Sequence, residues 1–430
     1  MSNSKTDFVA GTGARAVRPK FLAGMLFFGM VAACMDTPNL QLGGLSVKIA
    51  FIVFPIYVLI IISKYGVRMN AGDALCAGAF LLSIIPSVIN SVSPIHSVAF
   101  LFGAGVCVGA MFSFSVIVSR LGADAADVLV KFYRMTVVVS VLAVLLRLQE
   151  RGCYTFYEPS YWTIALIPYF CITFYRLSIG PPGCANLDCV FVLLAVLASQ
   201  SFSMVLWAFV VLLWMRFKAN KIRLGQIVAL VLCVVIGGGL AVAYDQRTQT
   251  TLSVIQDAQL DAEGFVRVAI HIAGNRVQRI CLAWDVAMSH FWDGVGLGVF
   301  KQFVASYLDG DDFSVMGMVA WDFILESNAV CVYLEMLAEG GFFGLLGYVI
   351  VLYRVYKVGQ SRVYATPMLE AFVVTMSALI IESSYLRPYV WALYGTVLGL
   401  SRVVTNYTHV QFCMPKALRE EVALKGSRQA

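Results

Sequence analysis

The chain reads Gly-Asn-Arg-Val-Gln-Arg at residues 274–279 and Asp-Gly-Val-Gly-Leu-Gly-Val-Phe at residues 293–300. Both runs lie in one long polar interval, from about Tyr244 to about Glu326, within a chain that is otherwise apolar. Connections between secondary-structure elements are usually short, and long ones are often functional. A long insertion that carries clustered arginines is therefore the first place to look for chemistry.

The composition around this interval is typical of a membrane protein. Hydrophobic residues make up 60% of the 430 residues and charged residues 13%, and the mean hydropathy is +0.81. Soluble domains are about 45–50% apolar and about 25% charged. Since a spanning helix needs roughly 20 apolar residues, we expect an all-α polytopic membrane protein with about twelve transmembrane helices. Their approximate centres are Phe28, Ile56, Leu82, Val106, Val139, Leu166, Leu194, Phe209, Leu232, Gly347, Met376 and Tyr394.

The distribution of lysine and arginine predicts the orientation. Most of the 31 Lys and Arg residues fall in alternate loops and in the two terminal segments, which the positive-inside rule places in the cytoplasm. The net charge of +6 follows from this bias and does not indicate nucleic-acid binding. Residues 1–244 then hold about nine spans and residues 245–326 form a helical extracytoplasmic loop. Residues 327–405 hold about three spans, and residues 406–430 form a cytoplasmic tail. Residues 121–132 are predicted to be a short surface helix.

Residues 275–292 of the long loop have helical periodicity. Six residues recur at spacings that place them on one apolar stripe: Val277, Ile280, Cys281, Trp284, Met288 and Phe291. Arg276 and Arg279, three residues apart, project from one flank of this stripe, and His290 lies further along the same flank. We expect the helix to lie on the membrane surface or on the bundle, with its arginines facing a cavity.

Arginines outside the membrane are the leading candidates for binding a phosphate. Guanidinium groups bind phosphate oxygens in a bidentate manner and stay charged at any working pH. Arg276, Arg279 and Arg387 are the first candidates, and Arg247 and Arg267 are secondary. The alternative interpretation is that these side chains pair with loop acids or lipid headgroups.

Two carboxylates near the ends of predicted spans, Glu158 and Glu326, are candidate bases. Each could equally be a helix cap or a structural hydrogen-bond partner. His290 is a candidate for substrate contact. Aromatic residues outside the membrane could stack on sugars: Tyr157, Tyr161, Trp284, Trp292 and Tyr385. No Cys or His spacing typical of a metal site is present, and we expect neither a metal nor a cofactor.

Three segments resemble a known family. The first is Arg-x-x-Arg-Ile-x-x-x-Trp-x-x-Ala at residues 276–287, followed by the glycine-rich run at residues 294–300. The second is Tyr-Leu-Glu-Met-Leu-Ala-Glu-x-Gly-Phe-Phe-Gly at residues 333–344, and the third is Phe-Tyr-Glu-Pro-Ser at residues 156–160. Together with a long loop before the last three spans, they resemble the O-antigen ligase and Wzy-type polysaccharide polymerase superfamily.

The resemblance implies metal-independent glycosyl transfer at the outer face of the bacterial inner membrane. The donor would be an undecaprenyl-diphosphate-linked oligosaccharide, and a chain-length regulator and other polysaccharide assembly proteins would be the partners. Ligases of this family carry a histidine about eleven residues before the Gly-x-x-Gly. Here that position, counted from Gly341, is Val330. This departure favours a polymerase of O-antigen or exopolysaccharide repeats over a ligase. A lipid-sugar flippase or transporter, or a non-catalytic assembly partner, remains an alternative.

Overall fold

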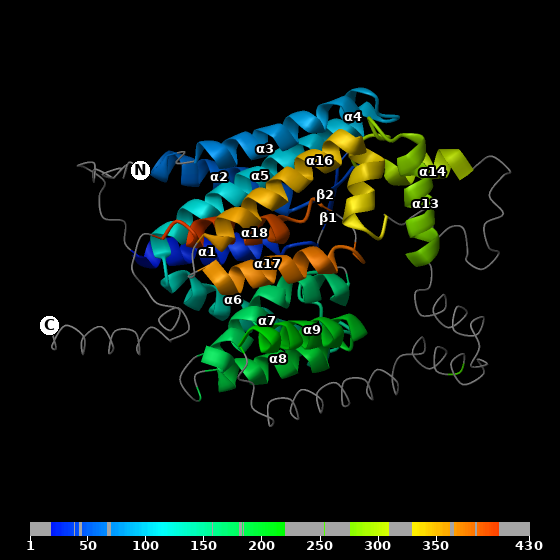
Figure 1. Ribbon diagram of the computed structural model, residues 1–430. Coiled ribbons are helices and arrows are strands. Elements are labelled where there is room, and N and C mark those ends of the chain that lie inside the picture. The colour runs from blue at the N-terminus through cyan, green and yellow to red at the C-terminus, as the bar shows by residue number, and fades with distance from the viewer. Residues whose placement is uncertain are drawn as a thin grey trace.

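The computed structural model describes residues 19–37, 39–42, 45–66, 70–156, 158–179, 183, 185–219, 253, 276–308, 329–361, 365–382 and 385–403. Figure 1 shows a bundle of helices. Its helices are α1 (Pro19–Ala33), α2 (Ala50–Tyr65), α3 (Ala71–Ser83), α4 (Ile85–Ile89), α5 (Pro94–Leu121), α6 (Asp124–Leu145), α7 (Pro159–Ile179), α8 (Asn186–Ser199), α9 (Phe202–Ala219), α13 (Arg276–Ser289), α14 (Phe300–Leu308), α16 (Val332–Gln360), α17 (Thr366–Ala378) and α18 (Pro388–Leu400).

The helices follow the predicted spans closely. Each predicted centre falls within a helix, except Leu232, which lies outside the described residues. In the described part of the chain, four segments are long and apolar enough to cross a membrane: Ala71–Ile89, Pro94–Leu121, Asp124–Leu145 and Val332–Gln360. The apolar, helical character of the chain is thus confirmed, whereas the number of twelve spans stays a prediction.

A short β-hairpin joins α1 to α2: strands β1 (Asn39–Leu42) and β2 (Leu45–Lys48) pair antiparallel, with Asn39 opposite Lys48. One local prediction needs correction. Residues 121–132 do not form a separate surface helix, because α6 runs without a break from Asp124 to Leu145. Its first turns are buried at Ala125, Leu129 and Phe132. Asp124 and Asp127 stand in the first turn of this helix, and apolar residues alternate with them.

Local sequence signals explain several helix ends. The Asn70 side chain accepts a hydrogen bond of 3.0 Å from the Gly72 N–H and so caps α3. Pro94 opens α5, where its missing N–H would have no helical partner. Gly122, at φ 58°, ends the same helix. Between α8 and α9, Gln200 adopts a left-handed conformation that ends the first of the two helices.

The closest helix packing is between α5 and α18. On α18, Gly395 and Gly399 stand four residues apart and face α5. A Cβ atom on Gly395 would lie 2.7 Å from the Cβ of Phe114, and one on Gly399 would lie 2.8 Å from the Ser115 carbonyl oxygen. Small residues at this spacing let helix backbones approach within a membrane. Buried aromatic residues pack around the contact, and the hydroxyls of Tyr348 and Tyr394 bond at 2.9 Å.

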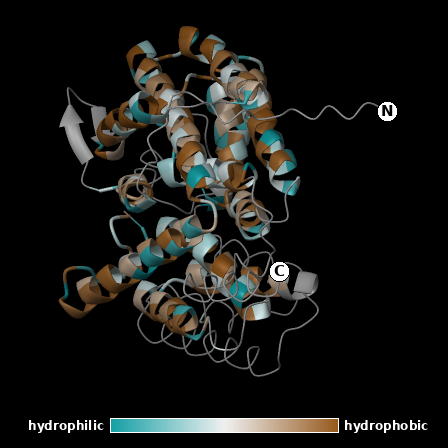
Figure 2. Cartoon of the chain, turned by 90° about the vertical axis from the view of Figure 1, so that its left-hand side faces the viewer, coloured by the Kyte–Doolittle hydropathy of each residue, from teal (hydrophilic) through white to brown (hydrophobic). Residues whose placement is uncertain are grey.

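The two ends of the bundle carry different polar groups. At one end, Asp73 on α3 pairs with Arg354 on α16 at 2.8 Å and with Arg402 after α18. At the other end lie α4, α13, α14 and the β-hairpin (Figure 1). Between them, large apolar side chains are exposed on α2, α3 and α5, such as Leu59, Leu75 and Phe102, and Figure 2 shows hydrophobic residues along the helices. Such a belt fits contact with lipid.

Candidate functional site

The candidate site lies at the end of the bundle where α13 packs. Arg276, the first residue of α13, pairs through Nη2 with Oε1 of Glu382 at 3.6 Å. The side chain of Arg276 is 43% exposed, whereas that of Glu382 is 8% exposed. Residues more than a hundred positions apart therefore meet, and Arg276 keeps a solvent-facing side that a ligand could reach.

Arg279, one turn further along α13, lies deeper. Burial lowers the pKa of its guanidinium, and the charge of Arg276 acts in the same direction. Tyr161, Glu158 and Glu335 act in the opposite direction. The start of α7 and the start of α16 thus supply the groups that surround this arginine. A positive charge is held in a partly desolvated position, where its interaction with a phosphate would be strengthened.

Arg387 has a different environment. Its Nη1 donates to Oδ2 of Asp36 at 2.5 Å, and its guanidinium lies 3.7 Å from the ring centroid of Tyr161. Lys48, at the end of β2, also pairs with Asp36. Burial alone would lower the pKa of Arg387, but the Asp36 carboxylate raises it. The Arg387 side chain is buried, and its guanidinium is paired with Asp36. This ion pair links the α17–α18 connection to the segment after α1.

The charge of Arg387 also shifts the pKa values of Asp36 and Lys48. Burial would raise the pKa of the Asp36 carboxyl, but the charges of Arg387 and Lys48 outweigh burial and lower it. Burial and the charge of Arg387 lower the pKa of Lys48 to about 8. One carboxylate is therefore shared between two cations, which leaves an excess positive charge beside Tyr161.

Two carboxylates at the site have contrasting environments. Glu158 is exposed and accepts a hydrogen bond from the Ser160 hydroxyl at 3.2 Å. Glu382 is buried, and burial raises its pKa; Arg276 opposes that change and Glu158 adds to it. Neighbouring carboxyl groups in unlike environments are a common arrangement for proton transfer. Glu158 is the one that solvent and an acceptor can reach.

The sequence left open whether the apolar stripe of α13 faces the membrane surface or the bundle. The buried residues are Leu282, Ala283, Val286 and Ala287, which pack in a cluster with α14 and α16. The predicted apolar stripe is largely exposed, because Cys281, Trp284 and Met288 face outward. At about 100° per residue, Arg276 and Arg279 share the buried face with Ala283 and Val286. The arginines therefore lie on the side of α13 that faces the bundle, whereas Trp284 and Met288 do not.

The two longest family-like motifs form one structural unit. The Gly298 and Phe300 N–H groups donate to the carboxylate of Glu339 at 2.8 and 3.3 Å. The Val295 and Gly296 N–H groups donate to the backbone oxygens of Ala338 and Glu339. The glycine-rich run is thus wrapped around the turn in α16 at Gly341, where φ is 66°. This unit fixes the direction in which α13 leaves the bundle.

Tyr385 belongs to that unit and is not free to stack on a sugar. It is 2% exposed, and its hydroxyl donates to Oε2 of Glu339 at 2.9 Å. His290 packs against the Phe303 ring at 5.0 Å between centroids and contacts the Ser289 hydroxyl. It lies roughly 16 Å along the helix axis from Arg279, at about 1.5 Å per residue. Trp284, 52% exposed, lies on the outward side of α13, next to the side that carries the arginines.

Four predicted site residues, Tyr157, Arg247, Arg267 and Glu326, lie outside the described residues. The structure in turn adds charged residues that the sequence analysis did not use: Asp36, Lys48, Glu335 and Glu382. Each of them sits at the end of a predicted span on the expected extracytoplasmic side. The presence of a charged residue at the extracytoplasmic end of a predicted span is the sequence signal that could have identified these four residues.

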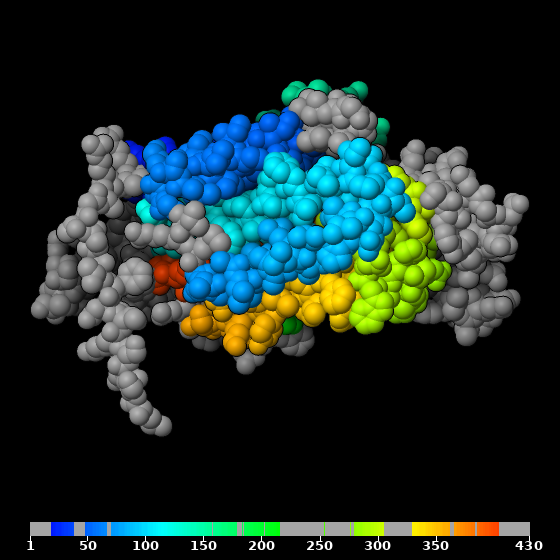
Figure 3. All heavy atoms as spheres, turned by 90° about the horizontal axis from the view of Figure 1, so that it is seen from above, coloured from blue at the N-terminus to red at the C-terminus, as the bar shows by residue number. Residues whose placement is uncertain are grey.

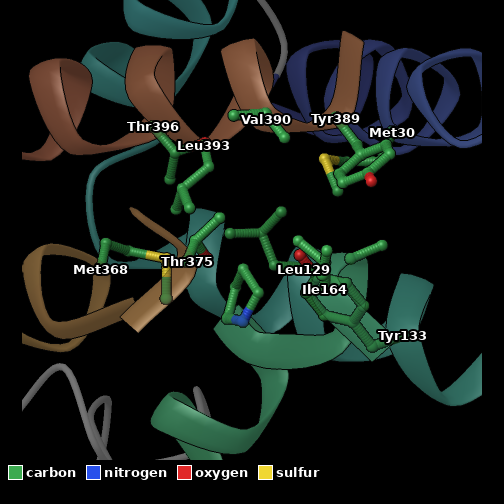
Figure 4. A pocket seen from close by; sticks show the side chains of 12 residues that line it. Met30, Leu129, Tyr133, Ile164, Met368, Thr375, Tyr389, Val390, Leu393 and Thr396 are labelled. Atoms are coloured by element: carbon green, nitrogen blue, oxygen red, sulfur yellow. The ribbon is translucent and has the colours of Figure 1, made fainter. Parts of the chain in front are cut away.

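A small pocket lies below the site, between α1, α6, α7, α17 and α18 (Figure 4). Its cavity volume is about 10 Å³, which is space for about one water molecule. Tyr389 lines this pocket, and its ring lies among the groups that interact with Arg387. The pocket is too small for a sugar or a lipid chain, so the candidate site is the charged cluster at the end of the bundle.

No protein-family model matches this chain and no curated protein matches it, so the resemblance to polysaccharide polymerases and ligases rests on the quoted motifs.

Proposed function

We propose that this protein is a polymerase that joins undecaprenyl-diphosphate-linked oligosaccharide repeats into O-antigen or exopolysaccharide. The reaction would take place at the outer face of the bacterial inner membrane, with both termini in the cytoplasm. The observation that carries the proposal is the meeting of Arg276 and Arg279 with Glu158 and Glu382 at one end of an apolar bundle. Cations beside a carboxylate base, next to a lipid phase, suit a lipid-linked diphosphate donor.

In this proposal the arginines bind the leaving group. As the bond between the donor sugar C1 and the diphosphate oxygen breaks, the electron pair moves to the diphosphate. Arg276 and Arg279 stabilise the charge that develops there. Arg276 is the more exposed of the two and would make the first contact. Arg387, which is occupied by Asp36, holds the surrounding loop in place and does not bind the donor directly.

A carboxylate completes the transfer. A hydroxyl of the acceptor sugar attacks C1, and its proton passes to Glu158, which is exposed and lies within electrostatic reach of Arg279. Undecaprenyl diphosphate leaves, and the acceptor chain is one repeat longer. Glu382 holds Arg276 in position through the 3.6 Å contact. Glu158 is therefore the candidate base and Glu382 a positioning residue.

The glycan profile of a deletion strain, resolved by size, tests the proposed activity. A polymerase predicts that single repeats accumulate and long chains disappear. Long polymer that is made but left on undecaprenyl diphosphate would instead identify a ligase. Lipid-linked repeats retained on the cytoplasmic leaflet would identify a flippase, and an unchanged profile would exclude all three activities in that pathway.

A further inference from the structure

Several large apolar side chains of α13, and one just after it, are exposed. Trp284 is 52% exposed and Met288 is 41% exposed, and Cys281 is exposed on the same side. Trp292, which follows the helix, is 62% exposed. Exposure of such large apolar side chains to water is unfavourable in free energy, and their transfer to an apolar environment is favourable. Two tryptophans on one small surface are also more typical of a membrane interface than of water.

Around its axis, α13 divides into three sectors. One sector, with Ala283 and Val286, packs on the protein. A second, with Trp284 and Met288, is apolar and exposed. At about 100° per residue, the third lies on the other side of Cys281 and holds Asp285 and Ser289, which are exposed and polar. A helix with one side on protein, one apolar side and one polar side fits the boundary between lipid and water.

The apolar sector of α13 continues onto a helix that is long enough to cross a membrane. The rings of Trp292 and Phe343 lie 6.0 Å apart between centroids. After Phe343, which is 46% exposed, exposed apolar residues continue along α16: Leu346, Val349, Ile350 and Tyr353. Figure 3 shows the surface of α13 and α14 adjoining that of α16. Residues 342–360, beyond the turn at Gly341, span roughly 28 Å at about 1.5 Å per residue, close to the hydrocarbon thickness of about 30 Å.

We propose that the apolar sector of α13 binds a phospholipid leaflet, with Trp284, Met288 and Trp292 inserted at the boundary between headgroups and acyl chains. The helix then lies along the membrane surface where α16 enters it. Arg276 and Arg279, on a neighbouring sector, come to the depth of lipid phosphate groups. The inference rests on exposure and continuity of the surface, and it does not depend on the proposed enzymatic activity.

Nitroxide labels on α13 test this directly in the full chain, reconstituted into vesicles of phosphatidylethanolamine and phosphatidylglycerol. The label is placed on native Cys281 or on Met288→Cys, with Asp285→Cys and Ser289→Cys as matched controls on the polar sector. The other native cysteines are replaced in each case. Oxygen concentrates in the hydrocarbon, whereas a nickel chelate stays in water. We expect the ratio of oxygen to nickel collision rates to be higher at 281 and 288 than at 285 and 289.

Two results would overturn the proposal. Equal nickel access at all four positions would place the apolar sector in water. Labels at 281 and 288 that are immobile and shielded from both reagents would mean that protein, such as a second copy of this chain, covers the sector. A second measurement needs no cysteine replacement. Brominated lipids are expected to quench the tryptophan fluorescence of the wild type, and this quenching should be smaller in Trp284→Phe and in Trp292→Phe. Quenching that is unchanged in both variants would also contradict the proposal.

Discussion

At the scale of single residues, the buried charges around Asp36 hold the candidate site together. Asp36 accepts from Arg387 and from Lys48, so one carboxylate neutralises part of two positive charges. Removing one partner of a buried pair costs about 3–5 kcal/mol, because the other charge stays buried without compensation. The size of the effect should depend on which residue is removed.

We predict that Asp36→Ala destabilises the protein by about 3–5 kcal/mol and that Arg387→Ala costs less. The first change leaves two cations facing each other, whereas the second leaves the Asp36–Lys48 pair intact. Thermal unfolding in detergent measures both. Asp285→Ala, at an exposed position on α13, is the control and should change stability by less than about 0.5 kcal/mol. A larger loss for Arg387→Ala than for Asp36→Ala would contradict this reading of the charges.

The raised pKa of the Glu382 carboxyl predicts that the stability of the protein depends on pH. Burial, with help from Glu158, raises its pKa above the usual 4.5 despite the nearby arginines. An acid whose pKa is raised on folding binds its proton more tightly in the folded state. Its contribution is therefore present below about pH 4.5 and is lost as the pH rises through the folded pKa. The variant Glu382→Gln resembles the protonated form. The difference between its melting temperature and that of the wild type should therefore shift in favour of the variant as the pH rises above about 4.5. A difference that does not vary with pH would contradict the prediction.

The sequence predicted part of the site at this scale. Arg276, Arg279 and Glu158 were chosen as charged residues outside the membrane, and the structure brings them together with Glu382. The role of Arg387 could not be predicted, because its partner Asp36 is 351 residues away in the chain. Only the tertiary fold shows that its guanidinium is occupied.

At the scale of elements, the unit of the glycine-rich run and the turn in α16 sets the position of α13. Gly294 and Gly341 have φ of 69° and 66°, a region that disfavours side chains with a Cβ atom. A Cβ on Gly294 would lie 2.6 Å from the Gly341 nitrogen, and a Cβ on Gly341 would lie 2.6 Å from the Trp292 carbonyl carbon. Neither backbone atom can move aside without opening the unit.

Gly294→Ala and Gly341→Ala should therefore each destabilise the protein by about 1–3 kcal/mol or more, since overpacking adds to backbone strain. Gly78→Ala on α3 is the matched control, because a Cβ there meets nothing within 4 Å. In a helix interior, alanine should be neutral or stabilise by about 0.5–1 kcal/mol. The yield and melting temperature of the detergent-purified variants report the effect. A tolerated Gly341→Ala would show that the turn in α16 can relax.

Sequence periodicity predicted the existence of α13 but not its buried face. The apolar stripe allowed two placements of the helix, on the membrane surface or on the bundle, and periodicity alone does not choose between them. In a membrane protein, large apolar side chains can face lipid while helices pack through small ones. Ala283 and Ala287 accordingly face the bundle, while Trp284 and Met288 face outward. The glycine-rich run and the segment at residues 333–344 could not be predicted to form one unit, because the sequence does not indicate the hydrogen bonds between them.

At the scale of the whole molecule, polar groups divide between the two ends of the bundle. The ion pairs of Asp73 with Arg354 and Arg402 lie at one end, and the cluster around Arg276 and Glu382 lies at the other. The hydropathy pattern alone located the helices, because apolar segments of this length are unmistakable in sequence. Helix neighbours were not predictable, because close contacts such as that of α5 with α18 depend on single glycines.

The charge distribution predicts that the two ends face different compartments. A membrane-impermeant maleimide added to intact spheroplasts should label Ser289→Cys, on the polar sector of α13, above the level of the wild type and without permeabilisation. A fluorescent protein fused after Ala430, which matures only in the cytoplasm, should be bright. Labelling of Ser289→Cys only after permeabilisation, together with a dark fusion, would reverse the orientation.

The glycan profile of strains that carry Arg276→Ala or Arg279→Ala tests the central claim most directly. The matched control is Arg151→Ala, an exposed arginine outside the charged cluster, and variant protein levels in the membrane are compared by immunoblot. The account predicts single repeats with few or no long chains in both α13 variants, and a normal distribution in the control. Long polymer of normal length in both variants, at normal protein levels, would contradict it.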